Sequence, residues 1–170
     1  RAAHERSVAG VVVDARTDAS TRVLVLHGDA APLAAPGRLH WVEPSDVPDG
    51  PEDSRGPEWA LLGRDGAGRA VLAAVFASNA DEPLVAPAGW AGLRVVGGDL
   101  STVEGGAFVE ALSLGRWLIE APFCPFCGTR TLLENAGWSR RCPECGREHF
   151  PRTDPAVIVA IGSAQHPDRL

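Results

Sequence analysis

Four cysteines are the residues in this sequence whose type and spacing most directly indicate chemistry. They form two C-x-x-C pairs, Cys124 with Cys127 and Cys142 with Cys145, and fourteen residues separate the pairs. Each pair lies in a Cys-Pro-x-Cys-Gly knuckle, in which the glycine permits the positive φ that turns backbone N–H groups toward sulfur. Two such knuckles can place four thiolates around one metal ion, which predicts a closed, structural zinc site with iron as the alternative metal.

Two disulfides or four buried free thiols are the other interpretations of the four cysteines. Disulfide frameworks are typical of small secreted chains, whereas two matching knuckles within one short stretch favour a metal. A thiolate metal site also favours a reducing compartment, so the expected location is cytoplasmic.

The composition indicates a globular, acidic chain. It has 170 residues, of which 45% are hydrophobic and 22% charged, and its formal net charge is −6. The negative balance argues against bulk electrostatic binding to nucleic acid. Apolar runs stay well short of a membrane helix, so no membrane partner is expected. The sequence contains no methionine, and we expect it to be an internal or trimmed piece.

A helix and a hairpin are predicted to position the cysteines. Ser101 and Glu104 form a capping box, and the helix should run from there to about residue 121, where Pro122 ends it. Residues 129–141 should form the hairpin between the knuckles, with 135–137 as its turn and Trp138 packed against the metal core. The buried face of the helix is predicted from apolar residues at three- and four-residue steps: Phe108, Ala111, Leu112, Gly115, Leu118 and Ile119.

The remaining segments are predominantly strand-like, which predicts an α+β fold. An N-terminal mixed α/β domain (1–121) with β-hairpins and one helix should precede a zinc ribbon (122–152) and the start of a further domain (153–170). Within the last segment, 156–161 is a continuous apolar run typical of a buried strand. Because a buried strand needs a partner to cover it, we expect the natural polypeptide to continue. The other predicted strands are 8–13 as an edge strand, 22–27, 38–42, a hairpin of 59–62 with 70–76, and 90–96.

The order of these features resembles the zinc-containing Nudix NADH pyrophosphatases, which also remove NAD caps from RNA. The residues that carry the resemblance are Trp117 near the helix end, the two knuckles around a central Trp138, and then Phe150-Pro-Arg-x-x-Pro before the apolar run. The resemblance is specific over 102–161 and weak over 1–90. It implies that 153–170 begins a truncated Nudix fold.

The resemblance further implies a homodimer that cleaves the pyrophosphate of NAD(H), or of NAD-capped RNA, to nicotinamide mononucleotide and AMP. Mg or Mn would be carried by the glutamates of the Nudix box. Phe150 matches an aromatic residue, usually Tyr, that contacts the dinucleotide, and Arg94 matches an arginine near the substrate. The alternatives are a core aromatic at the ribbon–Nudix junction for Phe150 and a surface arginine on a strand for Arg94.

The Nudix box itself is missing from the sequence. It contains no Glu-Glu doublet, and its single Arg-Glu step, Arg147-Glu148, directly follows the second knuckle. Carboxylates on one helical face would be needed to hold the divalent ions. No catalytic residue is therefore assigned, and this stretch alone is expected to be inactive.

A stand-alone zinc-ribbon module that binds nucleic acid or protein is the alternative function. The ribbon carries five arginines and three glutamates, a local charge of +2. That patch supports the alternative, whereas the overall charge of −6 opposes it.

Overall fold

The computed structural model describes residues 2–49, 56–79, 81–152 and 159. The predicted strand at 156–161 and nearly all of the predicted third segment, 153–170, lie outside the described residues. Among the described residues, no helix combines the length and the apolar character that crossing a membrane requires. The elements, in chain order, are η1 (Ala3–Glu5), α1 (Val11–Thr17), β1 (Arg22–His27), β2 (Ala30–Ala35), β3 (Arg38–Leu39), η2 (Pro44–Asp46), β4 (Glu58–Arg64), β5 (Ala70–Phe76), β6 (Trp90–Gly92), α2 (Leu93–Val96), α3 (Thr102–Glu120), β7 (Leu132–Glu134), η3 (Asn135–Gly137), β8 (Ser139–Arg141) and β9 (Glu148–His149).

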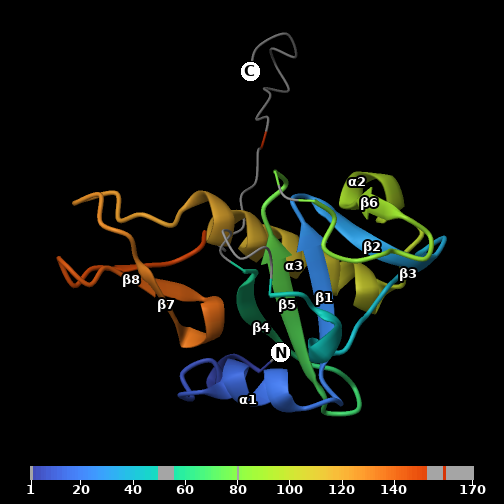
Figure 1. The fold of residues 1–170 in the computed structure, drawn as a ribbon, viewed down its shortest axis with the longest axis horizontal. Coiled ribbons are helices and arrows are strands. Elements are labelled where there is room, and N and C mark those ends of the chain that lie inside the picture. The colour runs from blue at the N-terminus through green and yellow to red at the C-terminus, as the bar shows by residue number, and fades with distance from the viewer. Residues whose placement is uncertain (1, 50–55, 80, 153–158, 160–170) are drawn as a thin grey trace, which may run out of the picture.

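A mixed six-stranded sheet forms the N-terminal body, with strand order β3-β2-β1-β5-β4 and β6 paired to β2. The central pair, β1 and β5, is parallel, and the predicted hairpin of β4 and β5 is antiparallel. A separate three-stranded sheet, β7-β8-β9, makes the ribbon, which lies beside β4 at one end of the molecule (Figure 1). The α+β class is thus confirmed.

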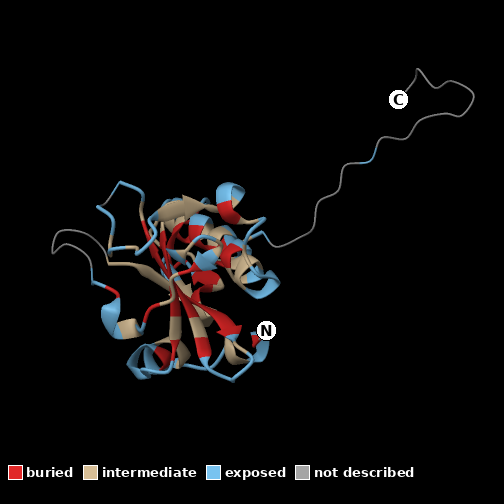
Figure 2. Cartoon of the chain, turned by 90° about the vertical axis from the view of Figure 1, so that its right-hand side faces the viewer, coloured by how far each residue is buried: buried red, intermediate tan, exposed pale blue. Residues whose placement is uncertain are grey.

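The central strands are buried on both faces, because side chains alternate between two cores. Leu24 and Leu26 of β1 join the core beneath α3, whereas Val23 and Val25 join the core on the side of α1. Figure 2 shows the buried residues concentrated along these strands. Helix α3 therefore packs on the buried face of the central strands.

Helix α3 begins and ends as predicted, and Ser101 caps it by accepting from the Glu104 N–H at 3.3 Å. The return bond of the capping box goes elsewhere: Glu104 accepts from the Leu39 N–H at 3.2 Å and so ties the helix start to β3. The buried stripe is Phe108, Ala111, Leu114, Gly115 and Leu118, while Leu112 and Ile119 are only partly buried.

Two strand predictions were wrong. The expected edge strand at 8–13 is instead a turn leading into helix α1, which begins after Gly10 at a φ of 80°. Val11, Val12 and Ala15 pack on the sheet at helical spacing, so burial of one helix face overrides the β propensity of valine. The expected strand at 90–96 is extended only over β6 and then becomes α2, so short helices accompany the one long helix predicted.

Candidate metal centre and adjoining cavity

The four cysteine sulfurs form one cluster. All four Sγ atoms lie within 4.8 Å of one another, and the Cys124–Cys145 and Cys127–Cys142 pairs are 3.7 and 3.4 Å apart. A tetrahedral site with Zn–S bonds of about 2.3 Å puts sulfurs about 3.8 Å apart, whereas a disulfide bond is only about 2.05 Å long. The cluster therefore fits a tetrahedral metal site of the zinc type and not a pair of disulfides.

Both knuckles have the same backbone hydrogen bonds. The Cys124 N–H donates to Thr129 O at 2.8 Å, and the Gly128 N–H donates to Cys124 O at 2.9 Å. The second knuckle repeats these two bonds at the same lengths, starting from Cys142 and Gly146. The glycine φ values are 74° and 72°, as the sequence predicted. Each pair of thiols is thus positioned by a rigid turn.

The four thiols lie so close together that they interact strongly as they ionise. Hydrogen bonds from Thr129, followed by one from Cys142, lower the pKa of the Cys127 thiol to about 6. The backbone hydrogen bond from Arg147 favours the Cys145 thiolate, but desolvation and the neighbouring thiols outweigh it and raise the pKa of Cys145 to about 11. A divalent metal would compensate four thiolates at once, so this donor set fits Zn²⁺ in charge as well as in spacing.

Trp138 packs against the N-terminal sheet and not against the metal core, which corrects the sequence prediction. Its indole Nε1 donates to Leu61 O of β4 at 2.7 Å, and the side chain packs on the core beneath α3. The guanidinium carbon of Arg6 lies 3.3 Å from the centroid of the Trp138 ring, and Arg6 also forms an ion pair with Glu110 of α3 at 3.5 Å. The ribbon is thereby anchored to both α3 and the chain's first turn.

Gly137 sets how closely the ribbon turn approaches β4, and Gly137→Ala is expected to destabilise this contact. The residue has a φ of 88°, and an added Cβ would lie 2.6 Å from the Ala60 Cβ and 2.8 Å from the Trp59 carbonyl oxygen. Strain at positive φ and backbone overlap together should lower the unfolding free energy by about 2–4 kcal/mol. Urea denaturation checks this. Gly66→Ala is the control, because nothing lies within 4 Å of its added Cβ; equal losses in both variants would contradict the expectation.

The positive patch predicted on the ribbon is largely neutralised by carboxylates. Arg140 is buried and donates to Glu58 at 3.3 Å. Arg141 donates to Glu134 at 2.9 Å and to Glu148 at 3.3 Å, and Arg130 lies 3.8 Å from Glu58. These pairings weaken the alternative of a ribbon that binds nucleic acid through bulk charge.

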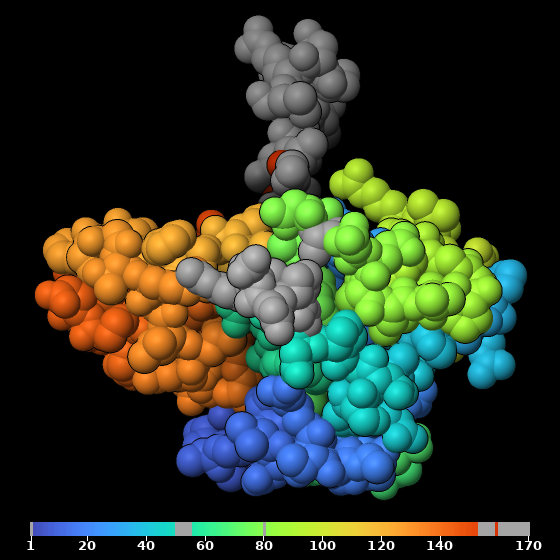
Figure 3. All heavy atoms as spheres, viewed as in Figure 1, coloured from blue at the N-terminus to red at the C-terminus, as the bar shows by residue number. Residues whose placement is uncertain are grey.

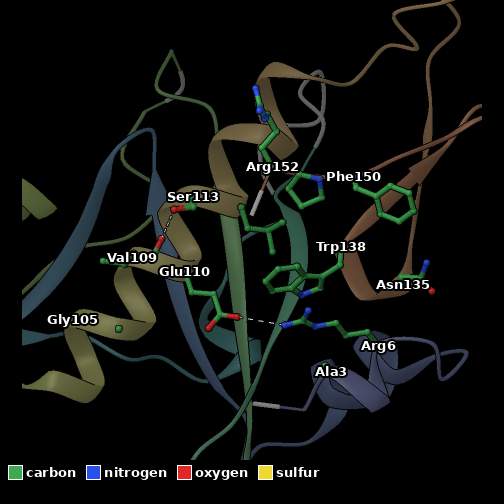
Figure 4. A pocket seen from close by; sticks show the side chains of 13 residues that line it. Ala3, Arg6, Gly105, Val109, Glu110, Ser113, Asn135, Trp138, Phe150 and Arg152 are labelled. Atoms are coloured by element: carbon green, nitrogen blue, oxygen red, sulfur yellow. Dashed lines mark hydrogen bonds and ion pairs between the residues drawn. The ribbon is translucent and has the colours of Figure 1, made fainter. Parts of the chain in front are cut away.

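A cavity of about 970 Å³ lies between α3 and the ribbon. Figure 4 shows Glu110 and Ser113 on the helix side, Phe150 on the ribbon side, and Trp138 between them. Phe150 is 62% exposed in the described part of the chain. The lining residues are Ala3, Arg6, Gly105, Gly106, Val109, Glu110, Ser113, Leu114, Asn135, Trp138, Phe150, Pro151 and Arg152.

The two substrate-contact residues suggested by sequence lie in different places. Phe150 lines the cavity, whereas Arg94 is exposed on α2, at the end of the molecule away from the ribbon (Figure 1). Arg94 lies near Asp29, the pKa of whose carboxyl is lowered mainly by a hydrogen bond from Arg116 and to a smaller extent by Arg94. Sequence reasoning missed Arg6 and Glu110, because no local pattern links the chain's start to the middle of α3.

Comparisons with known proteins identify two domains. Residues 20–117 match the model of the NADH pyrophosphatase-like rudimentary NUDIX domain, and residues 120–150 match the NADH pyrophosphatase zinc ribbon domain. The second match names zinc as the metal of such ribbons, in agreement with the sulfur geometry.

Curated relatives carry the name NAD-capped RNA hydrolase NudC. The protein of Mycobacterium tuberculosis strain H37Rv is 35% identical over 148 residues, which cover 86% of this chain and 42% of the relative. The Stutzerimonas stutzeri protein is 33% identical over 109 residues, covering 61% of this chain and 38% of the relative. The chain thus spans about two fifths of the length of these relatives.

Proposed function

The chain belongs to the NADH pyrophosphatase family, and on that premise we propose that it is the N-terminal and zinc-ribbon part of a Nudix hydrolase. The substrates are NAD(H), cleaved at its pyrophosphate to NMN(H) and AMP, and NAD-capped RNA. Structural zinc bound to the four cysteines stabilises the fold of the ribbon, while Mg or Mn is bound by the glutamates of the hydrolase domain. The whole protein acts as a cytoplasmic homodimer.

The exposed ring of Phe150 is the observation that carries this proposal. It lies at the ribbon side of the cavity, directly before Pro151 and Arg152, which also line the cavity. A planar ring exposed to this extent can stack on nicotinamide or adenine, and a nearby guanidinium can pair with phosphate. The ribbon would therefore present one wall of the dinucleotide site to a hydrolase domain.

Arg94 enters the proposal as a second guanidinium for the pyrophosphate. Because Arg94 and Phe150 do not share the cavity within one chain, the proposal assigns them to one dinucleotide only through the homodimer. Arg94→Ala should therefore raise the KM for NADH in the dimeric protein but not in a monomerised variant.

The proposal places the catalytic glutamates outside these 170 residues. Glu148, the member of the single Arg-Glu step, lies in strand β9 and is engaged by Arg141 and Asn135. It therefore does not form a carboxylate cluster on a helix of the kind that binds pyrophosphate-bridging metal ions. The stretch alone is expected to release no AMP from NADH.

Phe150→Ala in the protein produced from its natural gene is expected to raise the KM for NADH about tenfold, because one stacking contact contributes about 1–3 kcal/mol. Phe150→Tyr should keep the KM near the starting value, since the ring is retained. AMP release, measured by chromatography at several NADH concentrations, gives KM and kcat. Leu132→Ala is the control, because Leu132 is exposed on the ribbon but does not line the cavity.

Two outcomes would contradict the proposal, one for the role of Phe150 and one for the activity of the whole protein. An unchanged KM in Phe150→Ala would remove Phe150 from the dinucleotide site. Absence of AMP release by the unaltered protein with Mg or Mn present would refute the proposed activity itself.

A further inference from the structure

The exposed aromatic side chains of this protein are confined to the ribbon. Three of the five phenylalanines, Phe123, Phe126 and Phe150, are 56%, 65% and 62% exposed, whereas none of the five tryptophans is exposed. Phe150 belongs to the cavity described above, but Phe123 and Phe126 do not line it. These two rings flank the buried Cys124 and have no role in the proposed dinucleotide site.

Phe126 forms a stack that joins the two knuckles. It lies inside the first knuckle, and the guanidinium carbon of Arg147, directly after the second knuckle, is 3.2 Å from its ring centroid. The same four-sulfur cluster positions both residues, so a metal held by the four cysteines would preorganise the stack. Arg147 has no carboxylate partner among the described residues, and its charge is available to an anion.

Phe123 repeats the arrangement at the base of the same knuckle. The guanidinium carbon of Arg130 lies 5.8 Å from the Phe123 ring centroid, and a backbone bridge pairs the two residues. Glu58 lies 3.8 Å from Arg130 and offsets part of its charge. The knuckle thus carries two aromatic rings, each with an arginine, on the lobe that projects from the sheet (Figure 3).

We propose that Phe123, Phe126, Arg130 and Arg147 form a stacking platform for single-stranded RNA. Aromatic rings bind unpaired bases through their faces regardless of sequence, and a guanidinium beside each ring can stack on a base or pair with a phosphate. The overall charge of −6 disfavours phosphate contacts, so we assign most of the binding to ring stacking, with Arg147 as the local cation. Aromatic rings and arginines are enriched in protein interfaces as well, so a protein partner is an outcome that the RNA-binding test separates from this one.

The inference rests on the proposed function and deepens it. In a hydrolase for NAD-capped RNA, the dinucleotide occupies one site and the RNA that follows it requires another. The platform supplies that second site, so it should matter for capped RNA and not for free NADH.

The test uses the whole protein from its natural gene, with NADH and a 5′-NAD-capped single-stranded oligonucleotide as substrates. Phe126→Ala should raise the KM for the capped oligonucleotide about tenfold and leave the KM for NADH unchanged. Phe126→Trp should keep the KM for the capped oligonucleotide near that of the unaltered protein, because it preserves an aromatic face. Arg147→Ala should flatten the plot of log affinity against log salt concentration by about one unit of slope.

Arg38→Ala is the matched control, since Arg38 is also exposed but lies on β3, away from the ribbon (Figure 1). Zinc content is measured in every variant, so that a lost metal is not mistaken for a lost contact. Binding of the same oligonucleotide without its cap tests the platform even if NADH is not cleaved. Three results for Phe126→Ala would overturn the platform. They are an equal rise of KM for NADH and for the capped oligonucleotide, a change in the protein's oligomeric mass, or unaltered RNA binding with zinc retained.

Discussion

Cys127→Ser is expected to release the metal and unfold the ribbon while the N-terminal sheet persists. The Cys127 Sγ lies 3.4 Å from that of Cys142, within a cluster in which every sulfur is needed to complete the tetrahedron. Apparent zinc-binding free energies of structural sites are about 10–16 kcal/mol, and most of that free energy is folding free energy. The ribbon's own sheet has only three short strands, which do not replace it.

Zinc content by mass spectrometry and amide exchange by residue together check this expectation. The amides of Cys124 and Cys142, which donate within the knuckles, should lose protection, whereas those of β1 should keep it. Glu144→Gln is the control, because Glu144 is exposed in the second knuckle and supplies no ligand. Loss of zinc with unchanged exchange and an unchanged melting curve would show that the ribbon folds without metal.

The ribbon and the long helix could be predicted from sequence because their signals are local. The cysteine spacing fixes a metal cluster with little help from the rest of the chain, and Ser101 with Pro122 sets the limits of α3. The hairpin of β4 and β5 was likewise predictable, since its Gly-rich turn separates two apolar runs.

The docking of the ribbon could not be predicted, because it depends on contacts between distant segments. Trp138 reaches Leu61 of β4 after Asn135, Ala136 and Gly137, which all have positive φ. Glycine and asparagine favour this conformation, but alanine does not, so Ala136 gives no sign of it in the sequence. The stacking of Arg6 on Trp138 joins the chain's first turn to the ribbon. Helix α1 was not predicted for the same reason, because the sheet residues that it packs on lie elsewhere in the chain.

Arg140→Met is expected to lower the unfolding free energy by about 3 kcal/mol, because it removes a buried cation from between the sheet, α3 and the ribbon. The Arg140 side chain is only 2% exposed and donates from Nη2 to Leu118 O at 2.7 Å and to Glu58 at 3.3 Å. Its loss leaves a carbonyl and a carboxylate without this donor. The Arg140 Nε is buried without a hydrogen-bond partner among the described residues, which places the expected loss at the lower end for a broken buried pair.

Arg141→Ala provides the control within the same strand. Adjacent residues of β8 point to opposite faces, and the Arg141 side chain is 44% exposed, so its ion pairs with Glu134 and Glu148 should contribute only about 0–1 kcal/mol. Urea denaturation of both variants separates the buried arginine from the exposed one. The double variant Arg140→Met with Glu58→Gln should recover part of the loss, since it also removes a carboxylate that would keep only Arg130, at 3.8 Å, as its cation. Equal destabilisation by Arg140→Met and Arg141→Ala would mean that the ribbon is held to α3 by Trp138 and not by the buried arginine.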